Sequence, residues 1–95
     1  MEPIYDRSGI VIGWIHQGRI LDRSKRLRAF STGDTVYTMR GKILGKYRKG
    51  VFEDRTGGAV AFTREASAGP FLAVPKNPTI PSVPWGIDWE DFLSA

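Results

Sequence analysis

Residues 5–68 divide into four units of sixteen residues that align with one another without a gap. The units cover 5–20, 21–36, 37–52 and 53–68. A repeat this short forms one small piece of supersecondary structure, which cannot bury its apolar side by itself. We therefore expect the chain to stack four copies of one motif around a shared core, and this excludes most folds open to a chain of 95 residues.

Residues at the same position in the four units are here called a column. Two such columns indicate which structural motif each unit forms. The second position carries Asp or Thr, which can cap a turn, and the ninth position always carries Gly or Ala. The second-position residues are Asp6, Asp22, Thr38 and Asp54, and the ninth-position residues are Gly13, Ala29, Gly45 and Ala61. Because Gly weakens a strand interior by about 0.5–1 kcal/mol, small residues there indicate close backbone approach or a sharp bend where units meet.

Each unit has the sequence pattern of a β-hairpin. The strings Asp-Arg-Ser-Gly and Asp-Arg-Thr-Gly place a turn-capping side chain first and a glycine that accepts positive φ last, and β-favouring runs flank them. Long strands are predicted at 10–15, 26–30, 42–47 and 59–63, and shorter strands at 19–21, 35–37 and 51–53. The pattern predicts a meander of about eight short antiparallel strands.

We expect two apolar columns, the seventh and the last, to fill the shared centre. Their members are Val11, Leu27, Ile43 and Ala59, and Ile20, Val36, Phe52 and Ala68. One hairpin is marginal in water, so the four hairpins bury their faces against each other about a common axis and close the array. The predicted fold is all-β, with four tandem 16-residue β-hairpin repeats in a pseudo-fourfold antiparallel arrangement over 1–70 and a proline-rich C-terminal arm over 71–95.

The arm differs in composition from the repeats, since residues 69–95 hold five of the six prolines. Residues 71–74 are apolar and suit an extension of the sheet, and the prolines after them favour an extended path. Two Pro-x-x-Pro motifs, at 75–78 and 81–84, match peptides that dock into SH3-type grooves. A stiff linker that lies along its own protein is the preferred interpretation.

A short terminal helix is predicted after the prolines. Trp85, Trp89, Phe92 and Leu93 fall at the spacing of one helical face, and Asp88 suits the N-cap. A helix of about six residues cannot stand alone in water, so this aromatic segment must dock. We expect it to pack on its own domain; in the alternative, it anchors a second copy of the chain or a protein partner.

Several strings in the chain resemble one known family, the four-fold beta flower proteins, which are small and functionally uncharacterised bacterial proteins. The strings are the opening Pro3-Ile4-Tyr5-Asp6-Arg7-Ser8-Gly9, the dipeptides Gly13-Trp14, Ala29-Phe30 and Ala61-Phe62, the proline-rich stretch 75–84, and the ending Trp89-Glu90-Asp91-Phe92-Leu93. The resemblance covers nearly the whole chain. It implies four hairpins about a pseudo-fourfold axis, and it implies no activity, ligand or catalytic residue.

Basic side chains are concentrated in the repeats. Residues 5–68 hold 13 of the 14 Lys and Arg and six of the ten Asp and Glu, which gives this stretch a net charge of +7. The basic residues form two clusters in the sequence: Arg23, Lys25, Arg26 and Arg28, and Arg40, Lys42, Lys46, Arg48 and Lys49. A surface of this charge can hold phosphates, so nucleic-acid or polyanion binding is the alternative function. No recognised nucleic-acid motif accompanies the clusters, and a solvated basic face is the preferred interpretation.

The sequence offers little for catalysis or metal binding. It contains no cysteine and one histidine, His16, which precedes Gln17-Gly18 at a predicted exposed turn. Asp6, Asp22 and Asp54 are symmetric candidates for a metal site, but the arginine that follows each of them favours turn capping instead. We therefore expect no enzyme activity, no cofactor and no bound metal.

The longest apolar run, at 10–15, is far shorter than the roughly 18 residues that suggest a membrane span. The first residues do not form a secretory signal, and we expect a cytoplasmic location and no membrane partner. The function predicted from the sequence is a non-catalytic protein-interaction or self-association module. Its candidate contacts are Trp85, Trp89, Phe92 and Leu93.

Overall fold

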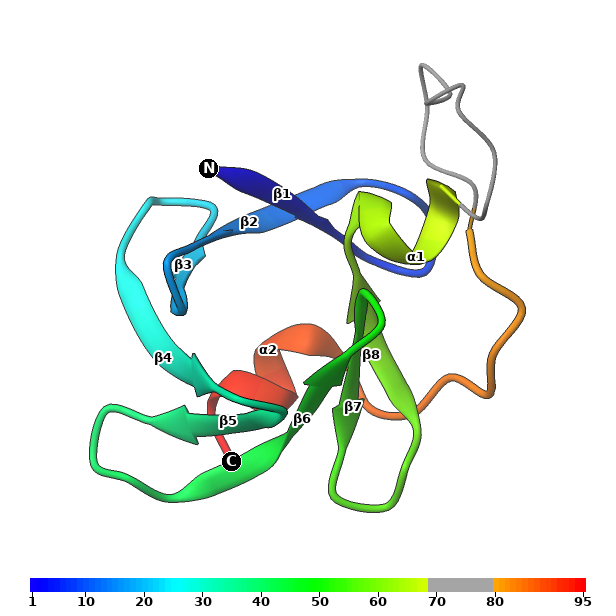
Figure 1. Ribbon diagram of the computed structural model, residues 1–95. Helices are drawn as coiled ribbons and strands as arrows, with labels where there is room; N and C mark the ends of the chain where they lie inside the picture. The colour runs from blue at the N-terminus through cyan, green and yellow to red at the C-terminus, as the bar shows by residue number, and fades with distance from the viewer. Residues whose placement is uncertain (69–79) are drawn as a thin grey trace.

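The computed structural model describes residues 1–68 and 80–95, in which eight antiparallel strands close into a barrel (Figure 1). The strands are β1 (Glu2–Tyr5), β2 (Val11–His16), β3 (Arg19–Asp22), β4 (Leu27–Thr32), β5 (Thr35–Thr38), β6 (Ile43–Arg48), β7 (Val51–Asp54) and β8 (Ala59–Phe62). Two short helices follow, α1 (Arg64–Ala68) and α2 (Trp89–Leu93). The predicted sheet extension at 71–74, the motif at 75–78 and the division between 70 and 71 lie outside the described residues.

The four hairpins share one register, which gives the barrel its fourfold character. In β1 and β2, Ile4 pairs with Gly13 and Tyr5 pairs with Val11, so the residue between, Ile12, has no partner of its own. The same one-residue bulge recurs in β3–β4, β5–β6 and β7–β8, each time sixteen residues further along. The prediction of an all-β chain built from four equivalent hairpins is confirmed.

The turns that join these hairpin strands are capped as the sequence predicts. We call the segments 6–10, 22–26, 38–42 and 54–58 the capped turns. The Oδ1 atom of Asp6 accepts the backbone N–H groups of Ser8 and Ile10 at 2.8 and 3.0 Å. The equivalent aspartates in the second and fourth turns do the same. In the third turn the hydroxyl oxygen of Thr38 accepts both bonds, at 3.2 and 3.0 Å, so a threonine can replace the carboxylate there.

The small-residue column lies where backbones approach closely, as expected. Each of its members is buried and pairs with a fully buried apolar residue on the preceding strand. The pairs are Ile4 with Gly13, Ile20 with Ala29, Val36 with Gly45, and Phe52 with Ala61. A Cβ atom built on Gly45 would collide with the carbonyl oxygen of Glu53 and lie 3.0 Å from the ring of Phe92.

The fourth member of the last column is not the residue that the repeat predicts. Ala68 belongs to α1 and not to a barrel strand, and the fully buried residue that continues this column on β1 is Ile4, sixteen residues before Ile20. β1 closes the barrel against β8 through the pair Tyr5–Phe62, so it occupies the position of a strand that would follow β8. The rings of Tyr5 and Phe62 lie 5.5 Å apart across this seam. The N-terminal strand thus completes the fourth unit because the chain turns into a helix after β8.

The expectation that the seventh column fills the centre is also wrong. Ile43 is 48% exposed, Val11 and Leu27 are half-buried, and Ala59 is buried at 2% exposure but is not part of the central cluster. The bulge in each hairpin shifts the register by one residue, and the apolar role passes to the eighth column. This column holds the residues without a strand partner, here called the bulge residues: Ile12, Arg28, Leu44 and Val60.

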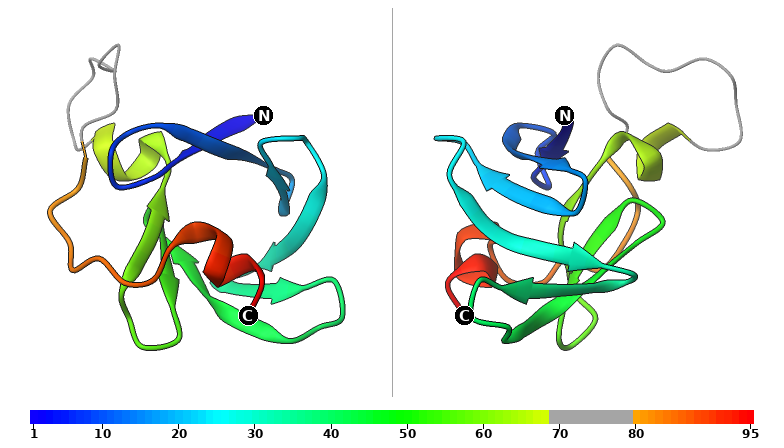
Figure 2. Two further views of the ribbon diagram at one scale, coloured as in Figure 1. Left: turned by 180° about the vertical axis from the view of Figure 1, so that it is seen from behind. Right: turned by 60° about the vertical axis from the view of Figure 1, so that its left-hand side comes forward.

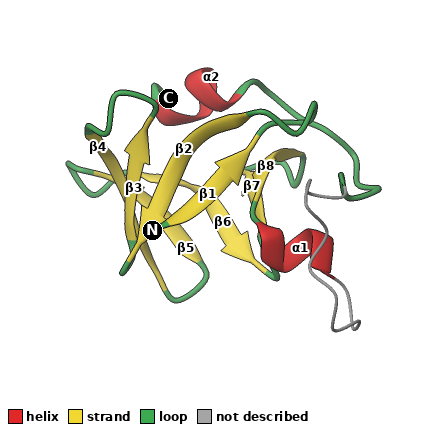
Figure 3. Ribbon diagram, turned by 90° about the horizontal axis from the view of Figure 1, so that it is seen from above, coloured by secondary structure: helices red, strands yellow, loops and turns green. Residues whose placement is uncertain are grey.

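The two helices lie at opposite ends of the barrel (Figures 2 and 3). α1 follows β8 beside the tight turn at Gly50, whereas α2 sits at the end that carries the capped turns. Trp89, Phe92 and Leu93 of α2 are 7%, 1% and 5% exposed and belong to the same core cluster as the barrel interior. α2 therefore plugs one mouth of the barrel. In residues 1–68 and 80–95 no helix is both long enough and apolar enough to cross a membrane.

Candidate functional site

α2 docks mainly through its aromatic side chains. The ring of Trp89 stacks on Phe92 at 5.6 Å and meets Phe52 edge-on at 5.1 Å. Together with Leu93, these residues join the bulge residues Leu44 and Val60 in one buried cluster. Three of the four residues predicted to contact a partner are thus buried against the barrel of their own chain.

Trp85, the fourth of these residues, is not on the helical face that its spacing predicts. The chain is still extended at Asp88, which is the N-cap, so α2 begins only at Trp89. Trp85 instead bridges to Ala59 at the start of β8, where Pro84 and Gly86 exchange backbone hydrogen bonds with Ala59 at 2.8 Å. Its half-buried ring lies 6.3 Å from the ring of Phe62.

The N-cap of α2 leaves one carboxylate uncommitted. The backbone carbonyl of Asp88 accepts the N–H of Phe92 at 2.9 Å, but the side chain of Asp88 makes no capping hydrogen bond. Asp88 is therefore the N-cap residue, as predicted, but its side chain does not cap the helix. Its carboxylate remains available to the space beside the helix.

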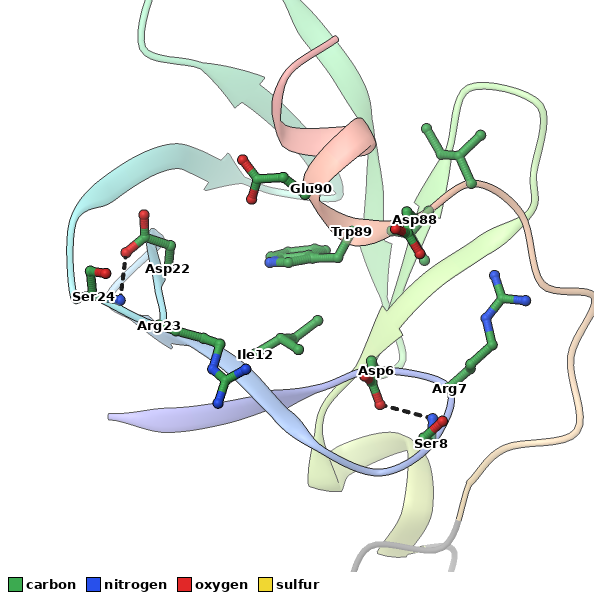
Figure 4. A pocket seen from close by; sticks show the side chains of 12 residues that line it. Asp6, Arg7, Ser8, Ile12, Asp22, Arg23, Ser24, Asp88, Trp89 and Glu90 are labelled. Atoms are coloured by element: carbon green, nitrogen blue, oxygen red, sulfur yellow. Dashed lines mark hydrogen bonds between the residues drawn. The ribbon is translucent and has the colours of Figure 1, made fainter.

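That space is a cleft of about 560 Å³, here called the mouth cleft, between α2 and the first two capped turns (Figure 4). Its volume falls within the range of about 300–1,000 Å³ that small-molecule sites occupy. The walls combine charged, hydroxyl and apolar side chains. They are Asp6, Arg7, Ser8, Ile12, Asp22, Arg23, Ser24, Val60, Ile87, Asp88, Trp89 and Glu90.

Hydrogen bonds favour the ionised form of Asp22 at this end of the barrel. The backbone N–H of Arg26 lowers the pKa of Asp22 most strongly, burial opposes this effect, and Ser24 and the guanidinium of Arg28 lower the pKa further. Arg28 also donates to Glu90 at 2.7 Å, which raises the pKa of Arg28. The ion pair of Asp22 with Arg28 is therefore a fixed feature of the cleft rim near neutral pH.

One buried donor on the cleft wall has no partner. The indole Nε1 of Trp89 is covered by neighbouring atoms and makes no hydrogen bond within residues 1–68 and 80–95. In Figure 4 the nitrogen end of the indole points toward the turn that carries Asp22 and Ser24. A buried donor without an acceptor costs about 1–3 kcal/mol, so this atom is a place where an added acceptor would stabilise the protein.

The sequence identified Trp89 as an anchor but gave no indication of the cleft. Ser8 and Ser24 occupy the fourth position of the first two units, and Ile12 and Val60 occupy the eighth position. These columns look like ordinary turn and strand positions. The only signal that could have found the cleft is that polar rim residues repeat in two adjacent units next to an aromatic segment that must dock.

The nine basic residues singled out in the sequence do not form one surface. Arg23, Lys25, Arg26, Arg40 and Lys42 belong to the second and third capped turns, whereas Lys49 lies at the opposite end of β6 in a tight turn. Arg28 is engaged by Asp22 and Glu90, and Arg48 pairs with Glu53 at 3.1 Å. Lys46 and Arg48 do share a second cleft, of about 490 Å³, with Arg55.

His16 ends β2 and is exposed, as predicted. It sits next to the tight turn at 17–18 and does not line the mouth cleft. In the part of the chain that the structure describes, no three His, Asp or Glu side chains come together as a set that could hold a metal ion. The aspartates weighed as symmetric metal ligands serve as turn caps.

A family model described as "4-fold beta flower protein" matches residues 2–87. The match spans all eight strands and stops just before α2. No curated protein and no solved structure matches the chain.

Proposed function

The chain belongs to the 4-fold beta flower protein family, and on that footing we propose that it is a non-catalytic binding domain whose site is the mouth cleft. The family description names a shape, so the proposal rests on the cleft itself. The observation that carries it is the unpartnered Nε1 of Trp89 on the cleft wall. Because neighbouring atoms cover this nitrogen, a ligand can bring an acceptor to it only when those atoms shift, and the new hydrogen bond would then remove an energetic defect of the free protein.

The chemistry of the cleft favours binding over catalysis. A general acid or base works best with a pKa near the working pH. Asp22 has its pKa lowered by hydrogen bonds and faces Arg28, so it is a fixed charge and a poor proton donor. Glu90 is committed to hydrogen bonds from the Arg28 guanidinium, at 3.3 and 2.7 Å.

A small ligand also suits the cleft better than a protein partner bound through the arm. A partner or a second copy that gripped Trp89, Phe92 and Leu93 would first have to pull α2 out of the barrel. Fully exposing three large apolar side chains costs about 1.5–3 kcal/mol each. Self-association through the arm would thus begin with a large penalty, whereas the cleft is open with α2 in place.

Two-dimensional ¹H–¹⁵N NMR of the full chain tests the proposal, because each of the three tryptophans gives its own indole N–H resonance. We expect at least one compound from a mixed library of sugars, organic acids, amino acids and nucleotides to move the Trp89 resonance saturably. The resonance of Trp14, which does not line the cleft, serves as the internal control. A library that leaves the Trp89 resonance in place at millimolar concentration contradicts the proposal.

The second cleft supports polyanion binding as a second candidate function, because Lys46 and Arg55 line it together with Arg48, whose guanidinium pairs with Glu53, and with Asp54. Titration of labelled DNA and RNA at about 50 and 200 mM salt tests it, since phosphate contacts weaken steeply with salt. Lys46→Glu and Arg55→Glu should each weaken binding more than Arg19→Glu, a matched charge reversal on exposed β3. Absence of binding at the lower salt concentration rejects this candidate.

A further inference from the structure

Resting on the proposed site, we infer that the mouth cleft takes a neutral polyhydroxylated ligand, a mono- or disaccharide. Some hydrogen-bonding groups of the cleft are already used within the protein and others are free. The free groups, and the charge around them, select the chemical class of ligand that can bind.

The acceptor that reaches Nε1 of Trp89 would enter an acidic corner. The nitrogen end of the indole faces the side of the cleft that carries Asp22, with Glu90 beside it (Figure 4). Arg28 already pairs with both of these side chains, so a carboxylate or phosphate oxygen placed there would face two acidic groups whose cationic partner is in use. A hydroxyl oxygen can accept from the indole N–H and direct its own proton to a carboxylate, so a hydroxyl suits this corner.

The groups still free around the cleft also call for a ligand that both donates and accepts. Asp88 offers a carboxylate acceptor, the hydroxyls of Ser8 and Ser24 can do either, and Arg23 offers donors. In the described residues, none of these four side chains makes a hydrogen bond. Adjacent hydroxyls on one carbon frame can meet acceptors and donors in turn, which a simple cation or anion cannot.

The floor of the cleft is apolar and suits the C–H face of a sugar ring. Ile12 and Val60, two of the bulge residues, line the cleft together with the Trp89 ring, and Figure 4 shows Ile12 and the Trp89 ring close together. Ligand sites commonly combine such an apolar surface with a few polar groups that fix orientation. A free cation would find carboxylates here but would leave the indole N–H without an acceptor.

The charge of the lining argues against an anionic ligand. Asp6, Asp22, Asp88 and Glu90 stand against Arg7 and Arg23 on the walls, and Arg28 behind the walls pairs with Asp22 and Glu90, which leaves a net charge of −1. Arg7 already binds the C-terminal arm: it donates to the carbonyl of Gly86 at 2.9 Å, and its guanidinium lies over the ring of Trp85. Only Arg23 remains free to meet an anion, and it is exposed.

The test titrates the ¹⁵N-labelled full chain with neutral mono- and disaccharides and follows the Trp89 indole resonance. Parallel titrations use the matching sugar acids, zwitterionic amino acids and inorganic phosphate. We expect a saturable shift with one or more neutral sugars. Asp88→Asn and Ser24→Ala should each weaken binding, by about tenfold and about three- to tenfold. Asp34→Asn, at an exposed turn on the opposite end of the barrel, should leave the affinity unchanged.

The outcomes separate this inference from the proposed function. A shift caused by sugar acids, amino acids or phosphate but by no neutral sugar overturns the ligand class and leaves the binding domain standing. A Trp89 resonance that no compound moves overturns both. Sugar binding that Asp88→Asn and Ser24→Ala leave at full strength, with unchanged melting temperatures, places the sugar elsewhere and also overturns the inference.

Discussion

Arg28 on β4 and Glu90 on α2 are 62 residues apart in the chain, and Nη2 of Arg28 donates to Oε1 of Glu90 across 2.7 Å. Arg28 is the one charged bulge residue, since its equivalents are Ile12, Leu44 and Val60. A fourfold mouth offers α2 four similar directions in which to lie. The ion pair distinguishes one of them, so Arg28 orients the helix that the apolar residues hold.

The ion pair should contribute little to stability despite its short distance. Glu90 has a side chain that is 64% exposed, and exposed pairs contribute about 0–1 kcal/mol. We expect Glu90→Ala to lower the free energy of unfolding in urea by less than about 1 kcal/mol. A double-mutant cycle with Arg28→Ala should give a coupling of about 0.2–1 kcal/mol. A coupling above about 2 kcal/mol would show that the pair holds the helix rather than orienting it.

Phe92 should contribute several times more than the ion pair. It is 1% exposed and packs against Trp89, so Phe92→Ala removes a large buried side chain. The expected loss is about 3–5 kcal/mol in urea unfolding. Ile80→Ala, at a position 44% exposed, is the control and should change little. A loss below about 1 kcal/mol for Phe92→Ala would mean that α2 is not docked in solution.

For Gly45→Ala, the structure and the repeat pattern predict different changes in stability. Two equivalents of Gly45 are alanines, so the pattern alone predicts a neutral substitution. A Cβ atom at this position collides with the carbonyl of Glu53 and crowds Phe92. We expect a loss of about 1–3 kcal/mol from overpacking, measured by urea unfolding. Ala29→Gly in the same column is the control, with an expected cost of about 0.5–1 kcal/mol; a neutral Gly45→Ala would favour the pattern over the geometry.

The barrel should depend on the apolar side chain that continues the last column on β1. Ile4→Ala empties a fully buried position on β1, and we expect a loss of about 2–5 kcal/mol. Met39→Ala, at a residue that is 61% exposed, is the comparison. Thermal melting of both variants measures the difference. Equal melting temperatures would indicate that β1 does not complete the fourth unit.

Acid should destabilise the protein through the capped turns. The backbone N–H of Arg26 and other donors lower the folded pKa of Asp22 below its ordinary value of 3.8. Burial opposes ionisation of Asp54, but hydrogen bonds from Thr56, Gly58 and Ile87 outweigh it and lower that pKa too. A folded pKa below the unfolded one contributes stability that is present above the unfolded value and lost as the pH falls through the folded value.

The free energy of unfolding should therefore be flat from pH 7 to about pH 5 and fall between about pH 5 and pH 2. Asp22→Asn keeps the Oδ1 acceptor of the turn and removes the charge, so its acid slope should be shallower. Parallel urea titrations at five pH values measure the slopes, and equal slopes in the Asp22→Asn variant and the parent would contradict this account.

The sequence allowed the architecture to be predicted because each turn cap is local. An Asp or Thr at the second position and a residue of positive φ three positions on are enough to define a hairpin. The bulges were not visible, because the extra residue at Ile12 and its equivalents obeys no local rule of composition. The role of Ile4 was not apparent for another reason, since a repeat aligned from residue 5 leaves every residue of β1 except Tyr5 outside the units.

The site was harder to predict than the fold because it depends on long-range docking. The spacing of Trp89, Phe92 and Leu93 correctly predicted a helix that must bury one face. Nothing in that spacing indicates which mouth the helix enters, or that its N-cap leaves a cleft beside two capped turns. Trp85 was placed on the wrong face because an extended N-cap interrupts the periodicity.

The seam between β1 and β8 gives the barrel an assembly order. Seven of the eight strand pairings join neighbours in the chain and can form as local hairpins, whereas the pairing of Tyr5 with Phe62 must span the whole repeat array. The plug α2 comes later still in the chain. During synthesis one edge of β1 therefore stays unpaired until β8 has been made. The core beneath the mouth stays exposed to solvent until residue 93 has been added.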